Sequence, residues 1–234
     1  MSRVRRIESP GNEGVILLGT KVRFDLERPA KRKRAQRVVD SSIHRSIRTM
    51  PPPFVKTIRE EILYEYAKLI SRSAYGSLQR GFITERFKKL RDGEISISDT
   101  IREWEREQEL PKECVFCGAK EDLSTDHLIP KNRGGDDSAD NLVLACKSCN
   151  ASRGDKGIFE WLGLEKKDSL HRLVAGKYLK QLLQVHTTAS TLNVTKKDIG
   201  DLCKRCPLPE VCEDWESVGK LSCFCLESVL PRIS

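Results

Sequence analysis

Four cysteines form two pairs, each with two residues between its members, and 28 residues separate Cys114 and Cys117 from Cys146 and Cys149. Thiolates at this spacing are the usual ligands of a structural zinc ion, which takes four of them in a tetrahedron. Such a site is closed, so it stabilises a fold and has no open position for a substrate. The alternative, four buried free thiols, is far less common for cysteines paired in this way.

The segment between and after these pairs carries a second set of polar and turn-forming residues. Asp126 and His127 are adjacent, and Asn150 directly follows the last cysteine. The whole pattern reads C-x2-C, D-H-x2-P, G-G, N-L and C-x2-C-N, with Pro130, Gly134, Gly135 and Asn141 at the intermediate positions. Over residues 112–162, about a fifth of the chain, the pattern resembles the zinc-stabilised subgroup of the HNH endonucleases.

The resemblance implies a ββα-metal fold, in which two antiparallel strands and a helix hold one divalent cation. It implies that Asp126 and Asn150 are protein ligands of that cation and that His127 is the general base. Asn141 matches the middle position of the family motif, which supports the loop that orients the histidine. Because the third position is Asn150 and not a histidine, His127 is the only candidate base in the motif.

These residue types suit the hydrolysis of a phosphodiester bond. A neutral imidazole accepts a proton from water near pH 7. A hard cation such as Mg²⁺ or Mn²⁺ prefers oxygen ligands, and two protein oxygens leave positions for phosphate and water. Each residue also has a plainer interpretation: His127 as a structural histidine, Asp126 as a loop carboxylate and Asn150 as a helix cap. Their occurrence together in the motif favours catalysis.

Five further cysteines lie near the C-terminus, at Cys203, Cys206, Cys212, Cys223 and Cys225. Four of the five could hold a second zinc ion or a [4Fe-4S] cluster, since both take four thiolates. The spacing of the first three resembles iron–sulfur segments of some recombination and CRISPR-adaptation nucleases. Free thiols are the third alternative. A metal here would have a structural role, because it would fold a segment poor in apolar residues.

The positive charge of the chain is concentrated at its start. Residues 1–50 hold 13 Lys and Arg against 5 Asp and Glu, so the whole net charge of +8 lies there. The densest run is Lys31, Arg32, Lys33 and Arg34. Such a run predicts contact with nucleic-acid phosphates without sequence preference, through counterion release. A solvated tail without a partner is the alternative.

Composition excludes several classes of protein. The 15 Gly and 10 Pro in 234 residues are ordinary, which argues against collagen-like and low-complexity chains. Apolar runs such as residues 15–18 are far shorter than the roughly 20 residues of a membrane span. The first residues lack a secretory signal pattern, and an odd number of cysteines argues against a disulfide framework. We therefore expect a cytoplasmic protein with no membrane partner.

Apolar periodicity predicts the elements that position the motif. One helix carries an apolar residue at every fourth position from Phe54 and ends at Gly76, and a second follows from Leu78 to near Gly93. A short third helix is expected after Ser98, and an amphipathic helix over residues 170–185. The predicted class is α+β, a mainly helical chain with an embedded ββα-metal domain. Its expected segments are a basic, loosely ordered one (1–53), a helical domain (54–111), the nuclease domain (112–165) and a helix followed by the Cys-rich segment (166–234).

Taken together, the sequence predicts a metal-dependent endonuclease that hydrolyses DNA, most naturally double-stranded. Arg153 and Lys156 follow Asn150 by three and six residues, and we expect both to contact the phosphate backbone. One such site cuts one strand, so a homodimer is a natural arrangement for cutting both. The alternatives are a non-catalytic zinc module that binds nucleic acid and a component of a larger defence or repair complex. A pure binder would need none of Asp126, His127 and Asn150.

Overall fold

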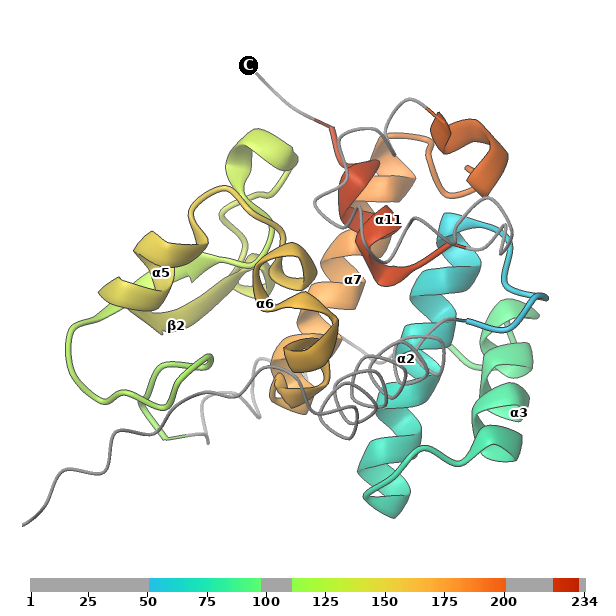
Figure 1. Cartoon of the computed structure of the whole chain (residues 1–234), viewed down its shortest axis with the longest axis horizontal. Helices are drawn as coiled ribbons and strands as arrows, with labels where there is room; N and C mark the ends of the chain where they lie inside the picture. Colours follow the sequence, from blue (N-terminus) through green and yellow to red (C-terminus); the bar gives the residue numbers. More distant parts are fainter. Residues whose placement is uncertain (1–50, 98–110, 201–220, 232–234) are drawn as a thin grey trace, which may run out of the picture. The chain divides into compact units, whose positions relative to one another are not determined.

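The computed structural model describes residues 51–97, 111–200 and 221–231 (Figure 1). The predictions for Lys31 to Arg34, for the helix after Ser98 and for Cys203, Cys206 and Cys212 therefore lie outside the described residues. The described elements are α2 (Ile58–Tyr75), α3 (Arg80–Arg91), β1 (Leu123–His127), β2 (Leu142–Cys146), α5 (Lys147–Arg153), α6 (Ile158–Lys166), α7 (Arg172–Thr188) and α11 (Cys223–Ser228), with short 3-10 turns at Lys131–Arg133, Ala139–Asn141, Lys167–Ser169 and Lys196–Ile199.

Local signals set the ends of α2, and the helix predicted there is confirmed. The Thr57 hydroxyl accepts from the Glu60 amide at 3.2 Å, and the Glu60 carboxylate accepts from the Thr57 amide at 3.2 Å. This capping box satisfies backbone donors that have no partner within the helix. The helix ends at Gly76, whose φ of 66° is a left-handed conformation that glycine adopts without strain. The α3 helix then packs on α2 through Ile83, Phe87 and Leu90, all buried.

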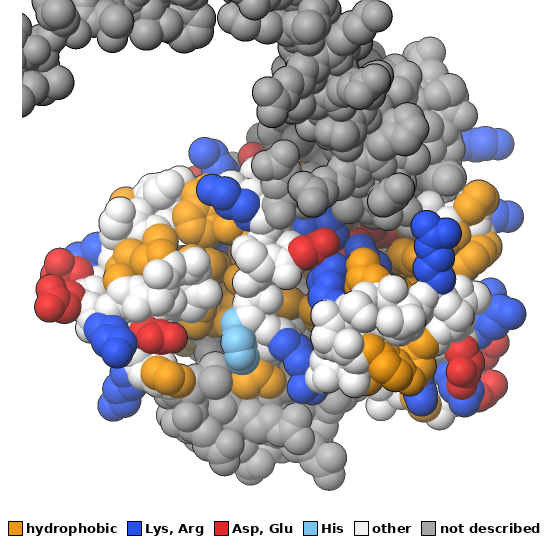
Figure 2. Space-filling model, turned by 60° about the horizontal axis from the view of Figure 1, so that its bottom comes forward, with side chains coloured by type: hydrophobic (Ala, Val, Ile, Leu, Met, Phe, Trp, Pro, Cys, Tyr) orange, Lys and Arg blue, Asp and Glu red, His pale blue; other side chains and the backbone are white. Residues whose placement is uncertain are grey.

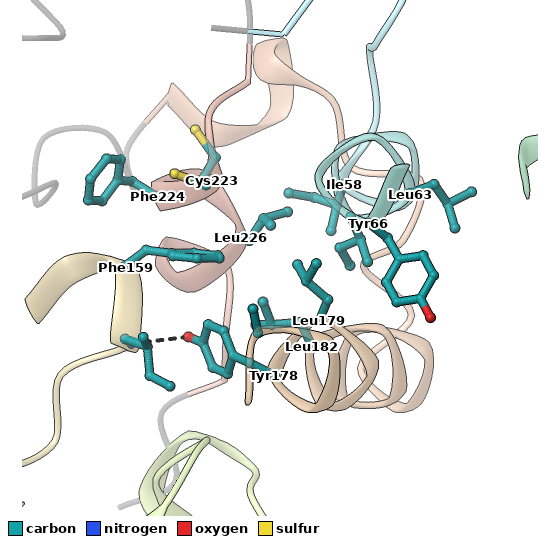
Figure 3. Packing of buried hydrophobic residues seen from close by; sticks show 14 of the residues in the cluster. Ile58, Leu63, Tyr66, Phe159, Tyr178, Leu179, Leu182, Cys223, Phe224 and Leu226 are labelled. Atoms are coloured by element: carbon teal, nitrogen blue, oxygen red, sulfur yellow. Dashed lines mark hydrogen bonds between the residues drawn. The ribbon is translucent and has the colours of Figure 1, made fainter. Parts of the chain in front are cut away.

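The main hydrophobic core lies between α2, α6, α7 and α11 (Figure 3). The α7 helix contributes Leu179 and Leu182, which point towards α2, and Tyr178, which points towards Phe159 of α6 in this view. The Tyr178 hydroxyl also accepts from the Ile158 amide at 3.3 Å, at the start of α6. The core therefore joins helices that come before and after the expected nuclease segment. The division of the chain into four segments remains a prediction.

The ββα unit is built from β1, β2 and α5. The two strands are antiparallel, with His127 opposite Leu142 at one end and Leu123 opposite Cys146 at the other. The α5 helix follows β2 without a loop and packs on both strands. This arrangement confirms the α+β class and the order of elements that the motif predicts. At the end of the unit that carries the four cysteines, the described residues form a small apolar cluster of buried Cys114, Ala145 and Cys146, with Phe116, Ala119 and Leu123 partly buried against it.

The short α11 helix fastens the C-terminal part of the chain to the start of α6. The Glu227 carboxylate accepts from the amides of Phe159 at 2.6 Å and Glu160 at 2.7 Å, and it also accepts from the Tyr178 hydroxyl. A Cβ atom at Gly157 would lie 2.1 Å from this carboxyl carbon, so the close approach requires glycine. The carboxylate thus occupies the helix N-terminus, where unpaired amides favour a negative group.

A buried histidine makes the stability of this core sensitive to acid. His186 is fully buried, its Nε2 bonds the Leu226 carbonyl at 2.8 Å and its Nδ1 bonds the Thr191 hydroxyl at 2.7 Å. Burial lowers the pKa of His186 from 6.5 to about 4. Since the unfolded chain binds the proton more readily, the stability that this group contributes is lost as pH falls from 6.5 towards 4.

We expect the free energy of unfolding to fall between pH 7 and pH 4 by up to about 3 kcal/mol more in the wild type than in His186→Gln. Urea unfolding at both pH values measures this difference. The comparison with the variant is needed because other groups also titrate between pH 7 and pH 4. Burial raises the pKa of Glu61 to about 8 and that of Glu227 to about 7, so these two groups increase the stability of the fold as pH falls. An equal fall in the two proteins would contradict the prediction.

None of the helices within residues 51–97, 111–200 and 221–231 combines the length and the apolar character that crossing a membrane requires.

Candidate functional site

The four cysteines of the two pairs converge at one end of the ββα unit. Cys146 ends β2 and Cys149 lies on α5, while a tight turn closed by the Gly118 amide on the Cys114 carbonyl brings the first pair beside them. All four sulfur atoms lie within 4.8 Å of one another, and those of Cys117 and Cys146 are 3.7 Å apart. Zinc–sulfur bonds of about 2.3 Å in a tetrahedron place sulfur atoms about 3.8 Å apart, so the cluster fits zinc.

The electrostatics of the cluster also suit a cation. Desolvation and hydrogen bonds to the three neighbouring cysteines raise the pKa of Cys149. Four thiolates so close together are therefore stable only with a positive ion between them. The turn that carries the first pair is fixed on the sheet by the Val115 amide, which donates to the Leu144 carbonyl at 3.0 Å. The cluster thus ties this turn to the sheet and helix.

Asp126 and His127 occupy the last two positions of β1 and face different surroundings. Asp126 points inward and is only 4% exposed, whereas the His127 side chain is 29% exposed. Both oxygens of the Asp126 carboxylate accept from the guanidinium of Arg153, with Nε to Oδ2 at 3.0 Å and Nη2 to Oδ1. Side chains alternate along a strand, so those of Asp126 and His127 point to opposite faces. The two residues are nevertheless neighbours at the end of β1.

Arg153 is buried, and its surroundings correct one prediction. The side chain is 2% exposed, and besides Asp126 it donates to the carbonyl groups of His127, Leu128 and Lys156. A guanidinium enclosed in this way does not reach a phosphate backbone, so the structure argues against the phosphate contact expected of Arg153. It instead holds the end of β1 against the end of α5. Lys156 is exposed, as the prediction for that residue requires.

His127 contacts an acidic residue that the sequence pattern did not single out. Its Nε2 lies 2.8 Å from Oδ1 of Asp137, and the other oxygen of Asp137 accepts from Lys131 at 2.7 Å. Hydrogen bonds to Lys131 and His127 lower the pKa of Asp137. No local spacing rule points to Asp137, since it lies ten residues after His127 in an irregular loop.

Asn141 is fully buried and acts as a brace between two loops. Its Oδ1 accepts from the Ile129 amide at 2.8 Å, and its Nδ2 donates to the carbonyls of Ile129 at 2.9 Å and Asp136 at 2.8 Å. A Cβ atom at Gly135 would lie 1.8 Å from the Ile129 carbonyl oxygen, which explains the second glycine of the pair. These bonds hold the 134–138 loop beside the residues that follow His127.

Asn150 lies on α5 and reaches back to β1. Its Nδ2 donates to the Ser124 hydroxyl and to the Thr125 carbonyl, both at 3.4 Å. The side chain is therefore oriented towards the strand that carries Asp126 and His127, and its amide oxygen is of a type that could bind a hard cation. Helix α5 and strand β1 thus bring Asn150 to the strand that carries Asp126 and His127.

Two of the C-terminal cysteines lie within the described residues. Cys223 and Cys225 are both buried in α11. Burial raises the pKa of Cys223 and raises that of Cys225 to about 11.

Trp161 lies on α6 and packs edge-on against Phe116, with 5.0 Å between the ring centroids, beside the end of the ββα unit that carries the four cysteines.

A comparison with protein families agrees with this geometry. Residues 114–156 match the family model described as HNH endonuclease. No curated protein and no solved structure matches the chain. The matched residues include the four clustered cysteines, both strands, helix α5 and the three polar residues that these elements bring together. Residues 114–156 of this chain are therefore an HNH endonuclease domain, a type of domain that indicates nuclease chemistry on nucleic acid.

Proposed function

We propose that this protein is a metal-dependent endonuclease that hydrolyses phosphodiester bonds of DNA, with double-stranded DNA as its substrate. His127 is the general base, and Asp126 and Asn150 hold a Mg²⁺ or Mn²⁺ ion. The observation that carries the proposal is the position of a half-exposed imidazole at the end of β1, next to Asp126 and on the strand that Asn150 reaches from α5.

The donor chemistry of these residues supports such a cation. The Arg153 guanidinium takes one bonding position on each oxygen of Asp126, and a carboxylate oxygen has a second lone pair for a metal. The amide oxygen of Asn150 is the second ligand. When bound, the ion supplies Lewis acidity and positions the phosphate. The imidazole of His127 is part-exposed and takes the proton of the attacking water as that water bonds to phosphorus. The bond from phosphorus to the 3′ oxygen breaks and this oxygen takes a proton from solvent, so the ends are the 5′-phosphate and 3′-hydroxyl that the resemblance to the family implies.

Affinity for DNA comes mainly from charges away from the reacting groups. Residues 51–234 hold 29 basic and 29 acidic residues, and the face in Figure 2 shows Lys and Arg interspersed with Asp and Glu. We assign nonspecific phosphate contact to Lys31, Arg32, Lys33 and Arg34, together with exposed Lys156. One site cuts one strand, so cleavage of both strands takes a homodimer or two successive events.

The other metal sites are structural in this proposal. Zinc fills the cluster of Cys114, Cys117, Cys146 and Cys149 and holds the ββα unit together. Four of the five cysteines near the C-terminus, Cys203, Cys206, Cys212, Cys223 and Cys225, hold a second zinc ion or a [4Fe-4S] cluster. A reducing compartment such as the cytoplasm suits a chain of free and metal-binding thiols.

Plasmid cleavage tests the proposal. With Mg²⁺ or Mn²⁺ the purified wild type is expected to nick or linearise supercoiled DNA, and His127→Ala to cleave at least about 100-fold more slowly because it has no general base. His171→Ala is the matched control, since His171 is exposed at the start of α7 and contacts none of the three site residues. Both variants should bind DNA like the wild type.

Two outcomes would overturn the proposal. Equal cleavage by the wild type and His127→Ala would remove the imidazole from the reaction. Tight, salt-sensitive DNA binding without cleavage under any metal would favour the alternative, a zinc module that binds nucleic acid or serves in a larger complex.

A further inference from the structure

The loop between β1 and β2 brings an acidic side chain onto the candidate base. Asp137 uses its two oxygens on two different partners, Oδ1 on Nε2 of His127 at 2.8 Å and Oδ2 on Lys131 at 2.7 Å. Its hydrogen bonds to Lys131 and His127 lower the pKa of Asp137, so the group is ionised at neutral pH. An ionised carboxylate only accepts hydrogen bonds, which requires that the proton of a neutral His127 ring sits on Nε2.

The backbone on either side of Asp137 is fixed by two hydrogen bonds, one to the buried side chain of Asn141 and one within the exposed loop. Asn141 donates to the carbonyl of Asp136, the residue directly before it, at 2.8 Å. The Asp136 carboxylate in turn accepts from the amide of Ser138, the residue directly after it, at 3.2 Å. The loop is therefore held at both neighbours of Asp137. Through this loop the buried amide of Asn141 acts on the ring of His127, although the two side chains do not touch.

Two hydrogen bonds fix His127, one to its main chain and one to its ring. The carbonyl oxygen of His127 accepts from the buried guanidinium of Arg153, which fixes the main chain of the residue. The bond to Asp137 then fixes the rotation of the ring and leaves Nδ1 as its only free lone pair. Rotation of the ring by half a turn would place Cε1–H in the position of Nε2–H, and the hydrogen bond to the carboxylate of Asp137 would be lost.

We propose that Asp137 is a positioning residue that orients His127 and keeps the proton on its Nε2, so that Nδ1 accepts the proton of the attacking water. This inference rests on the proposed nuclease function. Asp137 is 69% exposed on the side chain, and exposed ion pairs add little to stability. Substitution of Asp137 should therefore change the state of the ring and the rate of cleavage while the fold stays intact.

The first experiment needs no DNA and no cleavage. Long-range ¹H–¹⁵N correlation spectra of the full chain at a pH where His127 is neutral report which ring nitrogen carries the proton, with His127→Gln used for assignment. We expect a single Nε2-protonated form in the wild type. In Asp137→Ala the two nitrogen shifts should move towards each other as both forms become populated. Identical spectra of the wild type and Asp137→Ala would overturn the positioning role, whether or not the protein cuts DNA.

The second experiment measures cleavage. Asp137→Ala is expected to lower the turnover rate about 10- to 100-fold with unchanged DNA affinity, by analogy with partners that orient catalytic groups. Asp137→Asn keeps an acceptor oxygen and should recover most of that loss. Asp140→Ala removes the same charge from the same loop and should cleave within about threefold of the wild type. If Asp137→Ala cleaved normally while His127→Ala did not, the positioning role would fail and the nuclease function would stand.

Discussion

Cys117→Ser is expected to lose zinc and to unfold residues 112–156 while the helical core stays folded. Cys117 is exposed, so its loss removes a ligand without removing buried surface. The apolar cluster beside the cysteines has only three fully buried members, Cys114, Ala145 and Cys146, so the turn that carries the first cysteine pair depends on the metal more than on apolar burial. Structural zinc contributes about 10 to 16 kcal/mol to the folding of small zinc domains, which exceeds any other single contribution here.

Zinc content by elemental analysis and amide hydrogen exchange measure this result. We expect about one zinc per chain fewer in Cys117→Ser, and fast exchange in β1, β2 and α5 with protection kept in α2 and α7. Cys117→His is the matched control, because a histidine nitrogen is also a zinc ligand and the exposed position has room for it. That variant should regain zinc and protection. Full protection of β1 and β2 in Cys117→Ser without zinc would refute a structural role for the metal.

The cysteine cluster and the helices were predictable because each rests on a local pattern. A Cys-x2-Cys pair, with two residues between the cysteines, is a local metal-binding pattern. The two ends of α2, at Thr57 and Gly76, depend on residues within four positions. The ββα order was predictable from the resemblance of one continuous segment to a family. In each case the information lies within a short stretch of chain.

The remaining features depend on pairs that are far apart in sequence. Arg153 and Asp126 are 27 residues apart, and a lone arginine is usually exposed, so the phosphate contact was the natural expectation. Only the packing of α5 on β1 encloses the guanidinium. Glu227 lies 68 residues from the Phe159 amide that it caps, and no periodicity connects them. Asp137 contacts His127 through an irregular loop, where spacing has no fixed meaning.

These long-range pairs also explain how the helical parts support the site. The α6 helix follows the ββα unit, and its N-terminus is capped by Glu227 of α11, while its Ile158 amide donates to Tyr178 of α7. The end of α5 is in turn held by Arg153, which bonds the carbonyl of Lys156 just before α6. These bonds act together with Leu128, Ile129 and Val143, which belong to the main hydrophobic core, and they fasten the ββα unit to the helices.

The largest effect of a single charged residue is expected at Arg153. Arg153→Ala leaves the carboxylate of Asp126, itself 4% exposed, without its partner, and breaking a buried ion pair in this way costs about 3 to 5 kcal/mol. Arg153→Lys should recover only part of that loss, because an ammonium group cannot reproduce the forked contact with both oxygens or reach the three carbonyls as well. Urea unfolding gives both values.

A comparison with Lys156 separates a structural role from a phosphate contact. Lys156 is exposed, so Lys156→Ala should change the free energy of unfolding by less than about 0.5 kcal/mol but weaken DNA binding and lower its salt dependence by about one counterion. Arg153→Lys, which keeps the charge, should bind DNA with the salt dependence of the wild type and yet be less stable. If Arg153→Ala were as stable as the wild type and bound DNA with a reduced salt dependence, the guanidinium would belong on the phosphate backbone after all. We expect instead that Arg153→Ala is less stable than the wild type. Arg153 is buried against Asp126, and without the guanidinium the Asp126 carboxylate would be a buried charge with no partner.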